Sequence, residues 1–334
     1  MRAVRITAPD EAAVVDRPDP QAGPGEVLIR IERAGLCGTD VALLRGTMPY
    51  LADGRTTLPL QPGHEWAGRV VSVGEGVTAT APGDLVTGDT FIGCGTCTLC
   101  ATGRHHLCPD HLELGVLGQL EGALAELLVV PERAVHHLPA GVDADLGAMV
   151  EPASCSLRGV RLAAVGPGDR VLVWGAGTLA MFAALFAADS GASVTVVARR
   201  ESDRRFAADF GLATRDPADL GDERFDVIIE ATGSAEVTRR LLDNATAGVR
   251  VALLGVPGGD SGLPSGRLIA LDATLHAVLG GSDCIDEAAR RFASMGDTVR
   301  RLIGSVITLE DVPRALAAGL PRAAGSGPKT QIRF

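Results

Sequence analysis

The 334-residue sequence contains little of several residue types, and each shortage argues against a class of protein. Aromatic residues make up only 3% of the chain, which disfavours a large pocket for apolar or aryl ligands. Lys329 is the only lysine among many arginines, so Schiff-base chemistry would depend on one residue near the C-terminus. No apolar run approaches the roughly 18 residues that span a membrane. The N-terminal segment also lacks the apolar region and cleavage site of a signal peptide.

Basic residues are outnumbered by acidic ones, 31 to 41, which gives a formal net charge of -10. Nucleic acids are bound through basic surfaces, so this balance argues against a nucleic-acid partner. Hydrophobic residues make up 46% of the chain, enough for a sizeable core, and the length favours two domains. Seven cysteines without an export signal favour a reducing cytoplasm, in which thiols are free or bound to metal.

Two patterns of hydrophobicity divide the chain near residue 150. Before this point, short alternating runs such as 26–35 are interrupted by glycine and proline, which predicts an irregular all-β domain. After it, apolar strands such as 171–177 and 193–200 alternate with helical segments such as 178–191. This alternation predicts a parallel sheet that is covered by helices on both faces.

A glycine-rich turn follows the apolar strand that begins at Val171. Gly175, Gly177 and Ala180 form the pattern G-x-G-x-x-A. The first glycine permits a tight turn, the second lets the backbone approach a pyrophosphate, and the small third residue lets helix and strand pack closely. The pyrophosphate would lie at the helix N-terminus. Similar turns can bind nothing, but the strand before this one and the helix after it favour dinucleotide binding.

The end of the second strand in such a unit decides between NAD and NADP. Where an NAD-preferring site has an acidic residue for the ribose 2′-hydroxyl, this chain has Arg199 and Arg200, with Arg204 nearby. Guanidinium groups bind a 2′-phosphate, which a carboxylate would repel. We therefore expect NADP(H) as the preferred cofactor. NAD(H) is the alternative, because the arginines can be ordinary surface charges and Glu201 and Asp203 lie close by.

Residue types that bind metals occur in three separate segments. Cys37 lies in GLCGTD, His64 and Glu65 lie in GHEWAG, and Glu151 lies in MVEPASC. A thiolate, an imidazole and carboxylates suit a zinc ion with one coordination position left open. Singly, Cys37 is better interpreted as a buried thiol and His64 as a core histidine. Both, however, lie in glycine-bounded turns beside predicted strands, where side chains can converge.

Four further cysteines, Cys94, Cys97, Cys100 and Cys108, form C-x-x-C-x-x-C with a fourth thiol beyond a short loop. Four thiolates complete a tetrahedral shell and leave no open position, which is typical of structural zinc. An iron–sulfur cluster is the alternative, because ferredoxin-like runs share this spacing and Pro109 follows the last cysteine. The separation of the fourth cysteine favours zinc.

Other chemically capable residues have less specific contexts. The histidines expected to be solvated in the cysteine loop are His105 and His106. The cysteines expected to be buried free thiols are Cys155 and Cys284. Residues that could face a substrate cleft, with surface or packing roles at least as well supported, are Tyr50, Trp66, Glu113 and Glu121.

The motifs GLCGTD, PGHEWAG, the spaced cysteines, LEGALAEL, VEPAS and GAGTLA follow one another along the chain. In this order they resemble zinc-dependent medium-chain alcohol and polyol dehydrogenases, and the resemblance covers essentially the whole chain. It implies an α/β protein with a GroES-like irregular β catalytic domain and a Rossmann domain with a doubly wound parallel sheet. It also implies that the C-terminal segment returns to the catalytic domain. We therefore expect a catalytic domain at 1–147 with 286–334 and a Rossmann domain at 148–285.

The resemblance also implies roles at the matching positions. Cys37 and His64 would bind a catalytic zinc ion. Glu65 and Glu151 would share the remaining coordination, one directly and the other through water. Asp40 would orient the histidine from behind. With the ion of the four cysteines, two zinc ions per chain are expected.

The implied reaction moves a hydride between an alcohol and a nicotinamide. Zinc would lower the pKa of the alcohol, and the Thr39 hydroxyl would take its proton. Many relatives carry a histidine relay three residues further on, but this position is Ala42. The proton must then leave through a ribose hydroxyl, water or another side chain. The residues expected at the cofactor are Gly175, Gly177, Thr178, Leu179, Arg199, Arg200, Arg204, Thr232, Gly255 and Val256.

The substrate is indicated less sharply. GHEW, LCPDHLELG and GALAE are similar to sequences of the 2-deoxy-scyllo-inosamine dehydrogenase type, which oxidise an aminocyclitol during aminoglycoside assembly. The acidic balance suits an amino-bearing substrate. We expect a secondary alcohol of a polyol, aminocyclitol or (amino)sugar as substrate, and a homodimer or homotetramer as assembly. The alternatives are a carbonyl reductase of the same superfamily and a non-catalytic nucleotide-binding relative.

Overall fold

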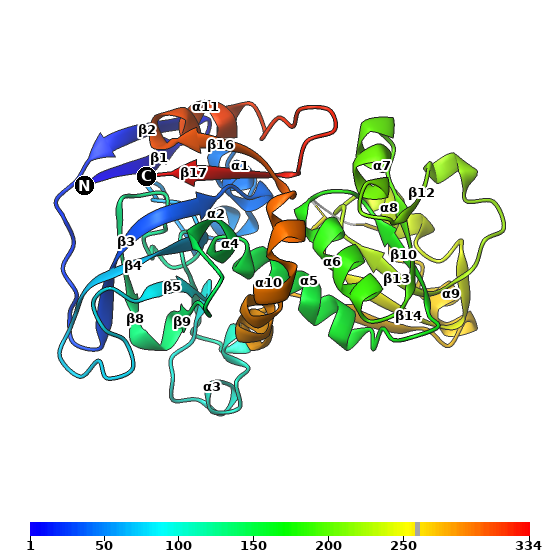
Figure 1. The fold of residues 1–334 in the computed structure, drawn as a ribbon, viewed down its shortest axis with the longest axis horizontal. Coiled ribbons are helices and arrows are strands. Elements are labelled where there is room, and N and C mark those ends of the chain that lie inside the picture. The colour runs from blue at the N-terminus through cyan, green and yellow to red at the C-terminus, as the bar shows by residue number, and fades with distance from the viewer. Residues whose placement is uncertain (258–260) are drawn as a thin grey trace. The chain divides into compact units, whose positions relative to one another are not determined.

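The computed structural model describes residues 1–257 and 261–334. The chain forms two compact units (Figure 1). Unit 1 comprises residues 1–151, 285–322 and 329–334, and unit 2 comprises residues 152–284 and 323–328. The first boundary lies inside helix α5 (Val150–Leu162), a few residues beyond the position expected from the sequence. The first turn of this helix, with Glu151, therefore belongs to unit 1.

Unit 1 is built on a seven-stranded sheet of order β16-β17-β3-β4-β5-β9, with β8 also paired to β3. The strands are β3 (Glu26–Gly35), β4 (Glu65–Val73), β5 (Leu85–Gly88), β8 (Leu127–Pro131), β9 (Val135–His137), β16 (Ile303–Thr308) and β17 (Lys329–Arg333). β16 and β17 run parallel, whereas β3 is antiparallel to β4, β8 and β17. The irregular β domain predicted for the first part of the chain is confirmed.

Two small sheets and several short helices complete unit 1. The small sheets pair β1 (Arg2–Ala8) with β2 (Glu11–Asp16) and β6 (Phe91–Ile92) with β7 (Leu112–Glu113). The helices are α1 (Gly38–Leu44), α2 (Pro49–Ala52), α3 (Thr98–Ala101), α4 (Ala144–Gly147), α10 (Ile285–Arg300) and α11 (Val312–Ala317). Most of these helices are too short to be stable alone, so the sheet and its turns must hold them in place.

The C-terminal strand lies inside the sheet of unit 1. β17 is inserted between β16 and β3, with Ile332 opposite Ala34. The N–H of Leu36 donates to the carbonyl of Thr330 at 3.0 Å, just beyond the last residue of β3. Figure 1 shows β17, in red, beside the blue β3. The first residue of β17 is therefore held next to the loop that follows β3.

The indole ring of Trp66 lies in the core of unit 1, where the residue has an exposed fraction of 0%. Side chains alternate along β4, so Trp66 points to the core while its neighbour Glu65 points to the other face. A Cβ atom on Gly88 would lie only 2.3 Å from Cζ2 of Trp66, so the indole ring uses the space that this glycine leaves. Trp66 therefore has the packing role that the sequence left open, not a place in a cleft.

Unit 2 contains a six-stranded sheet of order β12-β11-β10-β13-β14-β15, and each neighbouring pair is parallel. The strands are β10 (Arg170–Trp174), β11 (Ser193–Val197), β12 (Ala213–Arg215), β13 (Phe225–Glu230), β14 (Ala245–Leu253) and β15 (Thr274–Ala277). Numbered within the unit, this order is 3-2-1-4-5-6, which is that of a doubly wound dinucleotide-binding sheet. The predicted fold class is confirmed.

Helices connect the parallel strands of unit 2. They are α6 (Thr178–Asp189), α7 (Glu201–Ala208), α8 (Ala235–Arg240) and α9 (Ser265–Ala270), whereas α5 leads into the first strand of the sheet, β10. α6 packs against β10 and β11, and its residues 180–187 are all buried, which explains why this helix is apolar on every side. None of the helices in the described part of the chain is both long and apolar enough to cross a membrane.

The burial of Trp66 leads to a stability prediction. Trp66→Ala should lower the free energy of unfolding by about 3–5 kcal/mol, because it leaves a cavity beneath the sheet of unit 1. Trp66→Phe should cost less, since it retains most of the apolar volume. Thermal unfolding followed by circular dichroism measures both effects. Equal transition midpoints for Trp66→Ala and the unmodified protein would contradict the packing described here.

Candidate active site

Cys37 lies where β3 gives way to α1. It immediately precedes the helix and has an extended backbone, with φ -118° and ψ 158°. Its N–H donates to Oδ2 of Asp40 at 2.9 Å, so a carboxylate in the first turn satisfies the backbone at the helix start. Thr39 lies in the same turn, with Oγ1 3.8 Å from Sγ of Cys37. One short helix thus positions the cysteine, the threonine and the carboxylate that the motif GLCGTD contains.

His64 and Glu65 lie at the start of β4, and Glu65 pairs with Gly35 at the end of β3. A Cβ atom on Gly35 would lie 2.0 Å from Oε2 of Glu65, so the carboxylate occupies space that only glycine leaves free. The ligand atoms of Cys37, His64 and Glu65 lie within 4.8 Å of one another. Sulfur, nitrogen and oxygen donors at such separations fit the coordination shell of one zinc ion.

Burial and neighbouring charges shift the pKa values of this set. His64 is 6% exposed and Asp40 is fully buried. Burial raises the pKa of Asp40. Burial alone would lower the pKa of His64, but its hydrogen bond with Cys37 and the charge of Asp40 outweigh burial and raise it well above its usual value. Without metal, His64 and Asp40 therefore tend to be protonated, and a metal ion would have to displace the proton from His64.

His64 and Asp40 are close without being hydrogen-bonded. Nδ1 of His64 lies 3.8 Å from Oδ1 of Asp40, and within the described residues neither atom has a hydrogen-bond partner. Buried polar atoms are seldom left unsatisfied, so this pair fits a site in which the imidazole shifts slightly once its other nitrogen binds a metal. The role of Asp40 in orienting His64 stays a prediction, since the two side chains are near each other but not hydrogen-bonded.

Glu151 lies near this set but outside its closest group. Its carboxylate comes from the first turn of α5 and accepts a hydrogen bond from Oγ1 of Thr90 at 3.1 Å. Burial raises the pKa of Glu151 to about 7, and the neighbouring charge of Glu65 acts in the same direction. Glu151 is absent from the group whose ligand atoms lie within 4.8 Å, so the two glutamates are not equivalent in the structure.

Lys329 is part of the site, although the sequence argument gave it no role there. Its Nζ donates to Oε1 of Glu65 at 2.7 Å and to Oε2 at 2.5 Å, and the lysine is 3% exposed. The contact joins residues 264 positions apart in the sequence, so no local motif could reveal it. One signal was present: the only lysine of an arginine-rich chain lies in the last predicted strand.

A second polar cluster lies beside the segment that carries Thr90. The hydroxyl of Tyr50 donates a hydrogen bond to Oε1 of Glu113 at 2.8 Å, and the same oxygen lies 3.2 Å from Nε2 of His111. Glu113 is only 6% exposed, and burial together with this carboxylate raises the pKa of Tyr50. The guanidinium of Arg55 lies 4.3 Å from the centre of the tyrosine ring. Tyr50 and Glu113 were cleft candidates in the sequence, and the structure joins them in one network.

The four cysteines of the loop at 94–108 also converge. Their sulfur atoms lie within 4.8 Å of one another, with 3.8 Å between Cys97 and Cys108 and 4.0 Å between Cys94 and Cys100. A tetrahedral shell with zinc–sulfur bonds of about 2.3 Å has sulfur–sulfur edges of about 3.8 Å. These separations match the shell of a single ion, whereas an iron–sulfur cluster distributes its cysteines over several iron atoms.

The expectation that the two histidines are solvated is wrong for His106, whereas the side chain of His105 is 29% exposed. Nε2 of His105 lies 2.5 Å from Oδ2 of Asp89, whose side chain is 3% exposed. His106 is 1% exposed, and its ring meets that of Phe91 edge to face at 6.3 Å. The cysteine loop folds back on β6, which buries residues that the sequence pattern alone places in solvent. Of the two remaining cysteines, Cys284 is buried as expected, whereas Cys155 is partly exposed.

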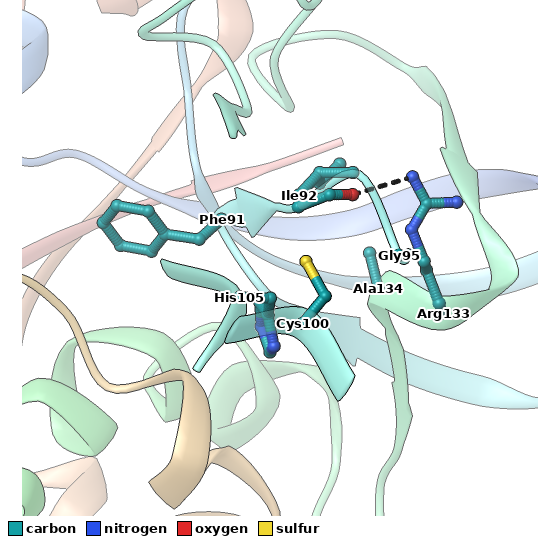
Figure 2. A pocket seen from close by; sticks show the side chains of 8 residues that line it. Phe91, Ile92, Gly95, Cys100, His105, Arg133 and Ala134 are labelled. Carbon is teal, nitrogen blue, oxygen red and sulfur yellow. Dashed lines mark hydrogen bonds between the residues drawn. The ribbon is translucent and has the colours of Figure 1, made fainter. Parts of the chain in front are cut away.

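A pocket of about 220 Å³ lies beside the cysteine loop (Figure 2). It is lined by Phe91, Ile92, Gly93, Gly95, Cys100, His105, Arg133 and Ala134. The guanidinium of Arg133 donates to the carbonyl of Gly93 at 3.1 Å, which ties the loop to the segment before β9. The pocket therefore belongs to the cysteine loop and is separate from the set around Cys37.

In unit 2, the glycine-rich turn has the geometry that its pattern predicts for a nucleotide site. Gly175 has a φ of 107°, which L-residues with side chains rarely adopt. A Cβ atom on Gly177 would meet no other atom within 4 Å, so open space lies beside the N-terminus of α6. Ala180 is fully buried, and its Cβ would lie 3.5 Å from one added to Gly175. Thr178 and Leu179 begin the helix at this opening.

The loops after β13 and β14 lie at the same end of the sheet as this turn. A Cβ on Gly175 would lie 3.1 Å from Cγ2 of Thr232, and one on Gly255 would lie 2.1 Å from the backbone nitrogen of Gly233. The buried carboxylate of Glu230 accepts the N–H groups of Thr232 at 2.6 Å and of Gly233 at 3.1 Å. Glu230 organises these loops, and the sequence argument did not include it. Val256 is 84% exposed.

The three arginines after β11 differ in their contacts. Arg204 donates to the carbonyls of Ala198 and Arg199 and to Asp216, so its guanidinium is committed to the end of the strand. Arg200 donates to Asp203 at 2.8 Å. The side chain of Arg199 is exposed and has no hydrogen bond or ion pair within the described part of the chain. Of the three arginines, Arg199 is therefore the one whose guanidinium is available to bind a ligand.

The nearby carboxylates are also occupied. Glu201 pairs with Arg205, and Asp203 pairs with Arg200. Neither acid is left free to accept the ribose 2′-hydroxyl at the end of β11, which is the position where an NAD-preferring site has a carboxylate. The acidic residues that supported the alternative cofactor are thus neutralised locally.

Comparison with known proteins agrees with this architecture. Residues 23–140 match the family described as alcohol dehydrogenase GroES-like domain, and residues 178–294 match zinc-binding dehydrogenase. An L-threonine 3-dehydrogenase of Saccharopolyspora erythraea is 35% identical over 272 residues, 77% of each chain. A sorbitol dehydrogenase of Halalkalibacterium halodurans is 31% identical over 245 residues, 69% of each chain.

A solved structure shows the same similarity along the whole chain. A putative zinc-binding dehydrogenase from Sinorhizobium meliloti 1021, bound to NADP, superposes with a TM-score of 0.88 and 30% identity, over 100% of this chain and 99% of that one. The chain belongs to the zinc-dependent medium-chain dehydrogenase family. It is an enzyme of the zinc-dependent alcohol dehydrogenase class, as the sequence motifs predict.

The geometry of the four-cysteine loop leads to a prediction about stability. Cys100→Ser should remove about one zinc equivalent per chain and lower the thermal midpoint by several degrees, because the metal no longer closes the loop. Metal analysis of the purified protein and a thermal scan measure both effects. Cys155→Ser is the matched control and should change neither value. Full zinc content with an unchanged midpoint in Cys100→Ser would rule out a structural ion here.

Proposed function

We propose that the enzyme uses zinc and NADP(H) to oxidise a secondary hydroxyl of a polyol, aminocyclitol or aminosugar, or to reduce the corresponding ketone. The observation that carries the proposal is the convergence of Cys37, His64 and Glu65 within 4.8 Å in a buried setting. This donor set leaves room for a substrate oxygen in the fourth position of a tetrahedral ion. Zinc-independent dehydrogenases need no such set.

In this proposal, Cys37, His64 and Glu65 bind the catalytic zinc directly, and Glu151 acts through water. The closest group of ligand atoms contains Glu65 and excludes Glu151, which is engaged with Thr90 instead. Asp40 keeps His64 in the tautomer that offers Nε2 to the metal. When bound, zinc supplies a Lewis acid that lowers the pKa of the substrate hydroxyl, and the nicotinamide exchanges the hydride.

The proton is handled by residues of α1 and its surroundings. The Thr39 hydroxyl lies 3.8 Å from Sγ of Cys37 and is the proposed acceptor of the alcohol proton. Ala42 provides no group to relay this proton. Water or a ribose hydroxyl then completes the transfer to solvent.

The preference for NADP(H) is supported by Arg199. Its free guanidinium lies just after β11, where a 2′-phosphate would be bound, while the neighbouring acids are paired with other arginines. The relative from Sinorhizobium meliloti is described as bound to NADP. Gly175, Gly177, Thr178 and Leu179 would surround the pyrophosphate, and Thr232, Gly255 and Val256 would lie along the rest of the cofactor.

The substrate class is supported by charge and by the relatives. Glu113 is a buried carboxylate that shares its network with Tyr50 and His111, and such a group can accept hydrogen bonds from an amine or hydroxyls. The net charge of -10 also favours approach by cations. The named relatives act on L-threonine, which has an amine beside its hydroxyl, and on sorbitol, a polyol. An aminocyclitol or aminosugar combines both features.

A carbonyl reductase is the alternative within the family. It would use the same residues in the opposite direction, so the preferred direction of turnover distinguishes the two. A non-catalytic nucleotide-binding relative would retain cofactor binding and show no turnover with any alcohol or ketone. The complete donor set around Cys37 favours the catalytic proposals.

The proposed assembly is a homodimer or homotetramer formed through unit 2. β15 is the last strand of its sheet, and Ile269 and Leu279, just before and after it, are 81% and 50% exposed. An edge strand with exposed apolar neighbours is suited to pairing with a second copy. Sedimentation or light scattering of the purified protein distinguishes this from a monomer.

The catalytic proposal is tested with a panel of neutral polyols, aminocyclitols and aminosugars, each assayed with NADP⁺ and NAD⁺. Cys37→Ala should lower kcat/KM for any active substrate by at least about a hundredfold, because several kcal/mol of transition-state stabilisation are lost with the metal. Removing zinc with a chelator should abolish activity, and adding zinc back should restore it. Full activity of Cys37→Ala would refute the mechanism.

The cofactor proposal is tested separately. Arg199→Ala should raise the KM for NADP(H) by about 10- to 100-fold and leave that for NAD(H) nearly unchanged, because one charge-assisted contact to the 2′-phosphate is lost. Arg205→Ala is the matched control, since this exposed side chain on the next helix is paired with Glu201 and is not among the expected cofactor residues. A native preference for NAD⁺, or equal effects of Arg199→Ala on both cofactors, would exclude the assignment.

A further inference from the structure

Lys329 and Glu65 form a buried ion pair at the edge of the metal-binding set. Nζ of Lys329 contacts both oxygens of Glu65 and also donates to the carbonyl of Leu36 at 3.1 Å. A lysine ammonium has three N–H donors, so all three have acceptors here. The two side chains are 3% and 1% exposed, and solvent therefore does little to weaken their attraction.

Stability alone is a poor reason for such a pair. Two charges lose their hydration on burial, and a well-packed apolar replacement is often as stable or more stable. The choice of lysine is also notable, because this is the only lysine in the chain and arginine is used everywhere else. A guanidinium is a wide planar fork, whereas an ammonium is compact and directs three donors to acceptors on different groups. The three acceptors around Nζ of Lys329 match the three donors of a compact ammonium.

The position of the carboxylate is restricted from the opposite side as well. Oε2 of Glu65 lies where a Cβ of Gly35 would be, at 2.0 Å, so β3 leaves a slot at its last residue. Lys329 lies at the start of β17, which β3 holds in register through the pairing of Ile332 with Ala34. Backbone pairing on both sides of β3 thus brings the slot, the carboxylate and the ammonium together.

The second glutamate has a different partner. Glu151 accepts a hydrogen bond from Thr90 at 3.1 Å, and its oxygens lie outside the closest ligand group. The two carboxylates that the family pattern allows at the metal are therefore distinguished by what holds them. Metal-binding carboxylates commonly need a hydrogen-bonding partner that fixes their orientation.

We propose that Lys329 is a positioning residue for the catalytic metal site. It holds the carboxylate of Glu65 in the Gly35 slot beside Cys37 and His64, and this makes Glu65 the directly coordinating glutamate. Lys329 itself touches neither metal nor substrate. The inference rests on the proposed function, because it concerns the metal ion proposed there.

The experiment compares metal binding by the unmodified protein and Lys329→Met, both loaded with Co²⁺ and titrated with a chelator. Absorption bands of the four-thiolate and one-thiolate sites differ in intensity, so the two sites are followed separately. Lys329→Met should bind metal about 10- to 100-fold more weakly at the one-thiolate site, with the four-thiolate site unchanged. Lys329→Arg, which retains the charge, should recover part of this loss. Arg333→Met, an exposed position on the same strand, is the matched control and should behave as the unmodified protein.

Two outcomes separate this inference from the proposed function. If Cys37→Ala and the unmodified protein bind the same amount of metal, there is no metal at Cys37 and the proposed function fails. If Cys37→Ala loses one metal and Lys329→Met binds it as tightly as the unmodified protein, only the role of Lys329 is overturned. A lower thermal midpoint in Lys329→Met without weaker metal binding likewise overturns it.

A measurement on the unmodified chain covers the case in which Lys329→Met does not fold. Protein labelled with ¹³C-lysine shows one Cε signal, because the chain has one lysine. This signal should shift when Zn²⁺ is added to the metal-free protein, since the Glu65 partner becomes a ligand. In Cys37→Ala the shift should be absent. An unchanged signal in the unmodified protein during metal binding at Cys37 would overturn the inference.

Discussion

A buried carboxylate confined from two sides is the constraint on which the rest of unit 1 depends. Glu65 can point towards Cys37 and His64 because Gly35 leaves space for it and Lys329 compensates its charge. These contacts require the C-terminal strand to return to the first sheet and lie beside β3. The chain leaves unit 1 and returns to it, and the returning strand brings Lys329 to the carboxylate of Glu65.

The functional groups of both units lie at the ends of strands, where short turns direct them. Cys37 follows β3 and His64 precedes β4, while Gly175 and Thr232 follow β10 and β13. Strand interiors provide apolar side chains for the cores. In β4, Trp66 packs in the core while the adjacent Glu65 belongs to the metal-binding set. The metal-binding set and the dinucleotide turn are built in different units.

Local patterns made much of this predictable. The apolar strand, the glycine turn and the apolar helix α6 predict a parallel sheet. The spacing of Cys94, Cys97 and Cys100 predicts a metal site. Each of these signals is contained in neighbouring residues. Contacts between distant residues carry no such pattern, and the partner of Glu65 was therefore missed. The commitment of Arg204 to strand carbonyls and the burial of His106 depend in the same way on how loops fold back, which sequence periodicity does not record.

The burial of Lys329 has a consequence for the outer surface. The one ε-amine is enclosed, and the Met1 amine is hydrogen-bonded to Arg17 and Asp19. The charged groups on the surface of the folded protein are therefore mainly guanidinium and carboxylate groups. Amine-directed cross-linkers would therefore find no accessible lysine side chain on the folded chain, because its one lysine is 3% exposed.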